Sequence, residues 1–132
     1  MLNEKDYCNL TISQALTNIG FTLEMTEHKY ERNLLAQRYE DIPKPLLYEA
    51  QKYLRDVMDV WVDVMAYNPD LGCVVRGNML YICRIIFTDN KILHGLWLQD
   101  EDERRIVFES HEDALSSGIS KAIEIVNTLN EQ

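Results

Sequence analysis

The sequence predicts a single α+β domain in which an antiparallel sheet of three or four strands is packed by two main helices and preceded by a short N-terminal helix. Three observations predict this fold class. Apolar residues recur at helical spacing toward both ends of the chain, they alternate with period two in its middle, and no repeat or low-complexity linker divides residues 1–132. The length also suits one hydrophobic core, because single domains most often have roughly 100–150 residues.

The first predicted helix spans residues 11–19. Thr11 and Gln14 have the spacing of a capping box, in which each side chain bonds the backbone amide of the other residue. Gly20 followed by Phe21 is typical of a helix that ends in a left-handed residue with an apolar contact folding back. Residues 22–41 show no clear period, and we interpret them as an irregular connector.

The second predicted helix spans residues 44–57. The segment Ile42-Pro-Lys-Pro45 starts it, because a proline is tolerated in the first turn of a helix, where its missing N–H has no intrahelical acceptor. Apolar residues then follow at helical spacing and need a sheet or another helix to cover them. They are Leu46, Leu47, Ala50, Tyr53, Leu54, Val57 and Met58.

Three strands are predicted over residues 60–67, 79–87 and 92–99, with a hairpin turn between the last two. In the first strand every second residue from Val60 to Ala66 is apolar and is expected to face the core. The strand at 79–87 is apolar on both sides, which indicates a central position with both faces covered, or with one face covered and the other in an interface. Residues 104–108 are a candidate for a further short strand.

The last predicted helix runs from Ser110 to about Leu129, with Ser110 and Asp113 in a capping pattern. Its Gly118 lies three and four residues from Leu115 and Ala122, on the packed side. A glycine inside a helix costs roughly 1 kcal/mol relative to alanine. We therefore predict a packing notch here, filled by a bulky neighbour such as Trp97 or Phe87.

Four segments, residues 11–21, 42–45, 53–62 and 111–126, cover under half of the chain, and the last has the pattern Glu-Asp-Ala-Leu-Ser-Ser-Gly-Ile. Together they resemble a family of small uncharacterised proteins encoded in prophages and mobile elements of gut bacteria. The sequence departs from the family pattern where Tyr53 replaces a tryptophan, where Met58-Asp59 replaces His-Asn and where His111 replaces a tyrosine. The resemblance implies this fold and a mobile-element origin, and it assigns no catalytic residue.

The composition excludes several classes of partner. The formal charge of −9 opposes binding to the nucleic-acid backbone, whose affinity comes from Lys and Arg, and it disfavours an anionic membrane surface. No apolar run reaches the roughly 20 residues that span a bilayer, and the first residues show no basic segment followed by an apolar one. We expect a cytoplasmic protein that binds neither nucleic acid nor membrane.

No catalytic, cofactor-binding or metal-binding residue is predicted. The histidines at 28, 94 and 111 and the cysteines at 8, 73 and 83 form no pair with metal-ligand spacing, and no phosphate-binding or nucleophile motif occurs. We expect His94 to be a partly buried structural residue and His111 to pack against or cap the last helix. Cys83 lies in an apolar run and is expected in the core.

The best candidate site is therefore a surface, on the outward side of the strand at 60–67. Its row consists of Trp61, Asp63, Met65 and Tyr67. Aromatic residues and methionine are enriched at interface cores, so this row is a candidate for docking a protein partner or a second copy of the chain. The alternative is that the connector or a helix covers the row within one chain.

The preferred function is a non-enzymatic interaction or accessory protein of a phage or mobile element. One alternative is an acidic decoy or inhibitor of a basic host protein. Another is a small hydrolase or ligand-binding domain, which would need an enclosed polar pocket that contains His94 or Cys73.

Overall fold

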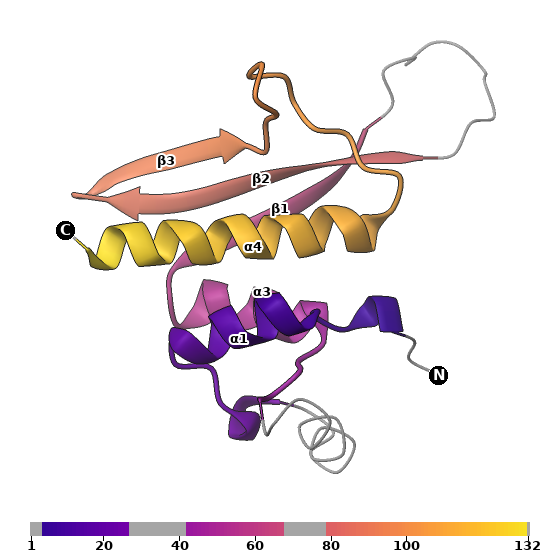
Figure 1. Cartoon of the computed structure of the whole chain (residues 1–132). Helices are drawn as coiled ribbons and strands as arrows, with labels where there is room; N and C mark the ends of the chain where they lie inside the picture. The colour runs from indigo at the N-terminus through magenta and orange to yellow at the C-terminus, as the bar shows by residue number, and fades with distance from the viewer. Residues whose placement is uncertain (1–3, 27–41, 68–78, 132) are drawn as a thin grey trace.

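Three α-helices and a three-stranded antiparallel sheet form residues 4–26, 42–67 and 79–131, which are the part of the chain that the computed structural model describes (Figure 1). The predicted α+β class, with its short N-terminal helix, is confirmed. In chain order the elements are η1 (Glu4–Asp6), α1 (Leu10–Asn18), η2 (Leu23–Met25), α3 (Leu47–Asp56), β1 (Val60–Tyr67), β2 (Leu80–Asp89), β3 (Ile92–Trp97) and α4 (His111–Asn130). Of the predicted connector at 22–41, only residues 22–26 are described, and residues 27–41 lie outside the described ranges.

The sheet has the strand order β1-β2-β3, with both neighbouring pairs antiparallel. A two-residue turn joins β2 to β3, and both of its residues have positive φ, 51° at Asn90 and 66° at Lys91. Two-residue hairpins favour this backbone because its twist matches that of the strands. β1 has its predicted bounds, whereas β3 ends at Trp97 instead of residue 99. The predicted strand at 104–108 is reduced to single bridges, at Arg105 and at Phe108.

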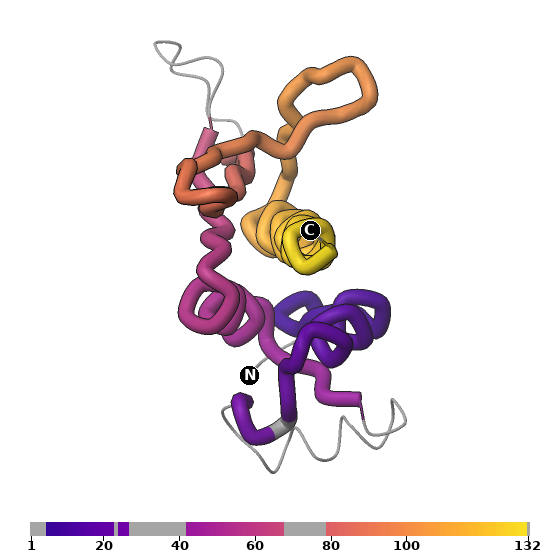
Figure 2. Tube along the Cα trace, turned by 90° about the vertical axis from the view of Figure 1, so that its left-hand side faces the viewer, coloured from indigo at the N-terminus to yellow at the C-terminus, as the bar shows by residue number. Residues whose placement is uncertain are grey.

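The helix α4 is the centre of the molecule. It lies along one face of the sheet. α1 lies on the side of α4 that is away from the sheet, and α3 lies below the sheet (Figure 2). It packs against β1, β2, α3 and α1, as its apolar face requires. No helix in the described ranges is long and apolar enough to cross a membrane. The buried residues that α4 contributes to the packed face include Ala114, Leu115, Gly118, Ile119, Ala122, Ile123 and Val126.

Gly118 lies at the point where α4 approaches the sheet closely. A Cβ placed there would be 2.5 Å from Sγ of Cys83 and 2.6 Å from Cγ1 of Val62, closer than such atoms can approach. The predicted packing notch is therefore present, but the expected neighbours Trp97 and Phe87 are wrong. Side chains of β1 and β2 fill the space instead, and Trp97 points to the opposite face of the sheet.

The start of α1 differs from the prediction. The helix begins at Leu10, and Asn9 is its N-cap, with Oδ1 accepting from the amide of Ile12 at 2.8 Å. Asparagine is at least as good a cap as threonine, so it takes this role one residue before the helix. The predicted end is confirmed, because Gly20 has a φ of 102° and the amide of Phe21 donates to the carbonyl of Leu16.

The helix α3 begins three residues later than predicted. Lys44 precedes a proline, and a residue in that position is disfavoured in the helical region. The segment before α3 consequently stays extended, and the carbonyl of Pro45 accepts from the amide of Cys8 at 2.9 Å. The side chain of Glu49 then accepts from the amide of Leu46 at 2.9 Å, which fixes the first turn.

Candidate functional site

The four residues predicted as an interface lie on the side of the sheet that faces away from α4. Paired residues of antiparallel strands point to the same side, so the register extends this side across β2 and β3. We call it the open face. Its residues are Trp61, Asp63, Met65 and Tyr67 of β1, Leu80, Ile82, Arg84, Ile86 and Thr88 of β2, and Leu93, Gly95 and Trp97 of β3.

No helix of the described part of the chain lies against the open face (Figure 2). Its side chains differ in exposure: Trp61 is 50% exposed and Leu93 is 72% exposed, whereas Ile82 is only 4% exposed. Met65 and Ile86 are half-buried. The face therefore combines buried or half-buried apolar side chains with large exposed ones.

A row of charged and aromatic side chains crosses the open face. Arg84 donates from Nη2 to Oδ2 of Asp63 on the neighbouring strand at 3.1 Å. The guanidinium of Arg84 also lies over the ring of Trp97, 5.4 Å from its centre, and that of Arg105 lies over the same ring at 4.2 Å. At exposed sites such cation–π contacts contribute roughly 0.5–1 kcal/mol each. The row thus holds the large side chains of the face in defined positions.

Two guanidinium groups of this row keep unused hydrogen-bonding capacity. Nε of Arg84 is buried without a hydrogen-bond partner. Arg105 has no ion pair with a described residue and is exposed. A guanidinium stacked on an aromatic ring is held in a fixed orientation and presents a planar set of donors, which suits carboxylates in particular.

A depression of about 350 Å³ lies where the open face meets α3. It is lined by Gln51, Arg55, Trp61, Val62, Asp63 and Ile86. Arg55 lies over the ring of Trp61 at 5.7 Å, and Gln51 donates from Nε2 to the carbonyl of Val62 at 2.7 Å. The lining of the depression thus combines apolar side chains with the charged side chains of Arg55 and Asp63.

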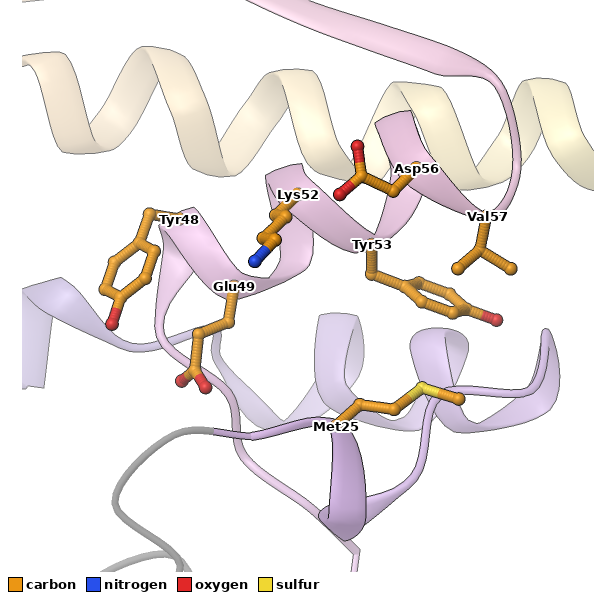
Figure 3. A pocket seen from close by; sticks show the side chains of 7 residues that line it. All are labelled: Met25, Tyr48, Glu49, Lys52, Tyr53, Asp56 and Val57. Carbon is orange, nitrogen blue, oxygen red and sulfur yellow. The ribbon is translucent and has the colours of Figure 1, made fainter.

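A second pocket, of about 260 Å³, lies between η2 and α3 (Figure 3). Met25, Tyr48, Glu49, Lys52, Tyr53, Asp56 and Val57 line it. The hydroxyl of Tyr53 donates to the carbonyl of Ile19 at 2.7 Å, and Glu49 accepts from the backbone at the start of α3. These polar groups therefore stabilise the fold, and none of the lining residues forms a nucleophile and base pair.

A third depression, of about 470 Å³, lies between the end of β3 and α4. Its polar lining comes from Gln99, Asp100, Ser117 and Lys121. Neither it nor the two preceding pockets is lined by His94, and Cys73 lies outside the described residues. The pocket required by the hydrolase alternative is thus not found among these three.

The two described histidines are aromatic packing partners. His94 stacks on Phe87, with ring centres 5.2 Å apart, and His111 meets Tyr81 edge to face at 5.7 Å. His94 is exposed and not partly buried as predicted, because β3 is an edge strand. The cap of α4 is Ser110, so His111 packs and does not cap. His28 lies outside the described residues.

The described thiols are poorly suited to nucleophilic chemistry. Cys8 and Cys83 are both buried. Burial, together with the negative charge of Asp63, raises the pKa of the Cys83 thiol from 9.0 to about 12. The thiolate is the reactive form, so Cys83 is inert at neutral pH. Within the described ranges no three His, Cys, Asp or Glu residues come together as metal ligands.

Sequence reasoning found one strand of the open face and missed the rest. Arg84 is the single charged residue in the apolar run at 79–87, and this was the available signal that a second strand contributes to the face. Trp97 and Arg105 gave no local signal, because their stacking depends on pairing between separate strands.

No family model matches the chain, and neither a curated protein nor a solved structure matches it.

Proposed function

We propose that the chain acts as a non-enzymatic binding protein whose open face engages a protein partner. The observation that carries the proposal is the composition of this face: both tryptophans of the chain lie on it, and three arginines contact their rings. Tryptophan and arginine are among the residue types most enriched in side chains that dominate binding energy. The origin in a phage or mobile element belongs to the same proposal and depends on the sequence resemblance alone.

The arginines also indicate the chemistry of the partner surface. The chain has a net charge of −9, yet Arg55, Arg84 and Arg105 gather on or beside this one face. Carboxylates that approach Arg105 gain charge-assisted hydrogen bonds that the free chain does not make there. The complementary surface of the partner therefore combines apolar side chains with acidic ones. A basic partner, as in the decoy alternative, would have to bind elsewhere on the chain.

Affinity capture from the native host, quantified by mass spectrometry, tests this proposal. The bait is the full chain as wild type, as Trp61→Ala and as Tyr48→Ala. Tyr48 is the matched control, because it is an aromatic residue 45% exposed on α3, away from the open face, whereas Trp61 is 50% exposed.

We expect the Trp61→Ala bait to recover the partner at a level at least several-fold lower than the wild type, and the Tyr48→Ala bait to recover it fully. Loss of a central aromatic side chain costs more than about 1–2 kcal/mol of binding energy, which corresponds to about tenfold in affinity. Equal recovery by all three baits would place the binding surface elsewhere.

A further inference from the structure

Strand β3 forms one edge of the sheet, and this edge carries no protection against pairing. Its residues, Ile92 to Trp97, include no charged residue and no proline, although 27% of the chain is charged. Ile92 is 60% exposed and Leu93 is 72% exposed. Natural edge strands usually carry a charge, a proline or a bulge, because an apolar edge recruits further strands.

The backbone of β3 also presents unused hydrogen-bonding groups. The two-residue turn makes Asp89 and Ile92 a hydrogen-bonded pair, and bonded pairs alternate along an antiparallel ladder. Leu93 and Gly95 consequently direct their N–H and C=O groups away from β2. No other described segment bonds them. These groups form a template for an additional strand.

The opposite edge of the sheet, at β1, is guarded. The carbonyl of Val62 accepts from Gln51 at 2.7 Å, and the side chain of Arg55 lies over Trp61. Asp63 places a charge on this strand. A new strand would have to displace these groups at β1, whereas β3 needs no rearrangement.

We propose that β3 pairs antiparallel with β3 of a second copy of this chain, around a twofold axis beside His94. In this register Leu93 of each copy lies opposite Gly95 of the other, and both residues point to the open face. The glycine leaves room for the leucine, because the atom nearest to a Cβ at Gly95 is Cδ of Arg84, 3.9 Å away.

Charge favours a second copy joined along this edge over one stacked on the open face. Joining two β3 strands brings together uncharged residues, so the net charge of −9 on each chain is not concentrated at the contact. Stacking two open faces around a twofold axis would bring the arginines of one copy toward those of the other, which is unfavourable. The edge contact also leaves Trp61 free, so it is compatible with the proposed partner binding and does not depend on it.

Sedimentation of the purified full chain at micromolar to high micromolar concentration tests the inference. The variants are Leu93→Lys, which puts a charge on the edge, and Gly95→Pro, which removes an N–H that points away from β2 and so costs no ladder bond within one chain. Val57→Lys is the matched control, because Val57 is 59% exposed beyond the end of α3 and far from β3 in sequence.

We expect a wild-type dimer whose Kd rises at least about tenfold in Leu93→Lys and in Gly95→Pro, and does not change in Val57→Lys. Hydrogen exchange checks the geometry, because the amides of Leu93 and Gly95 become protected only in the dimer. Thermal unfolding of the variants confirms that each chain stays folded.

Two results would overturn the inference. A wild-type chain that sediments as a monomer at the highest concentration excludes the pairing. A dimer that persists in both β3 variants but dissociates in Trp61→Ala would show that two copies meet through the open face instead.

Discussion

At the scale of single residues, Gly118 shows how one missing side chain sets the distance between a helix and a sheet. The glycine is buried against Cys83 and Val62, both of which are themselves buried and cannot move aside easily. The intrinsic penalty of roughly 1 kcal/mol for glycine in a helix is thus offset by the close packing that it permits.

Replacing Gly118 should destabilise the fold in order of side-chain size. We expect Gly118→Ala to lower the free energy of unfolding by about 1–2 kcal/mol, because overpacking costs more than the gain in helix propensity, and Gly118→Leu to lower it by more. Urea unfolding measures both. Adding Cys83→Ala should restore part of the loss in the alanine variant, since it removes the atom nearest to the new methyl group. A Gly118→Ala chain as stable as the wild type would contradict the close approach.

Cys83, which packs against Gly118, also makes the stability of the fold depend on pH. Its thiol pKa is raised to about 12 in the folded chain from an ordinary value of 9.0, first because of burial and then because of the charge of Asp63. A raised pKa means that the folded state keeps a proton that the unfolded state loses. The stabilisation is therefore present below pH 9.0 and is lost as pH rises toward 12.

Stability should fall with alkaline pH, and Cys83 should account for part of the slope. We expect the free energy of unfolding of the wild type to decrease at pH values above 9.0, and that of Cys83→Ala to decrease less steeply. A smaller decrease remains in the variant, because burial also raises the pKa of Tyr53. Urea unfolding at neutral pH and at several values above 9.0 measures the two slopes. Identical slopes would show that the Cys83 thiol titrates alike in the folded and unfolded chains.

At the scale of elements, helix α1 shows why a sequence pattern can predict a helix and misplace its start. Asn9 and Thr11 are both good N-cap residues and lie two positions apart. The choice depends on what precedes the helix: the amide of Cys8 bonds the carbonyl of Pro45, a residue far along the chain. That contact fixes the chain entering α1 and is not visible in the local sequence.

Substitutions at Asn9 and at Thr11 show which of the two residues caps α1. We expect Asn9→Ala to lower the free energy of unfolding by about 1 kcal/mol, because the amide of Ile12 loses its acceptor. Thr11→Ala should change it by a few tenths at most, since Thr11 is exposed within the first turn. Thermal unfolding compares the two variants. A larger loss for Thr11→Ala than for Asn9→Ala would restore the capping box predicted from the sequence.

Period and turn chemistry predicted the strands and α4 well. Alternation defined β1 to the residue, and Ser110 caps α4 through the amide of Asp113 as expected. The end of β3 was misplaced because it depends on contacts with distant backbone at residues 105–106. The start of α3 was misplaced because Lys44 precedes a proline and is therefore disfavoured in the helical region. Local sequence predicts an element reliably where its own side chains determine it.

At the scale of the whole molecule, none of the helices in the described ranges lies against the face of the sheet that is opposite to α4. α4 buries the inner face, and α1 and α3 in turn pack against α4 (Figure 2). The open face is the consequence, since none of the described helices remains to cover the other side. Its β1 row was predicted from alternation, but its extension over Arg84, Trp97 and Arg105 required the register between strands.

The central claim is that this open face is the binding surface, and the two tryptophans test it most directly because both lie on it. The measurement is ¹⁹F NMR of the chain labelled with 5-fluorotryptophan, recorded with and without the captured partner. The resonances of Trp61 and Trp97 are predicted to shift or broaden when the complex forms. Formation of the complex with both resonances unchanged would contradict the account.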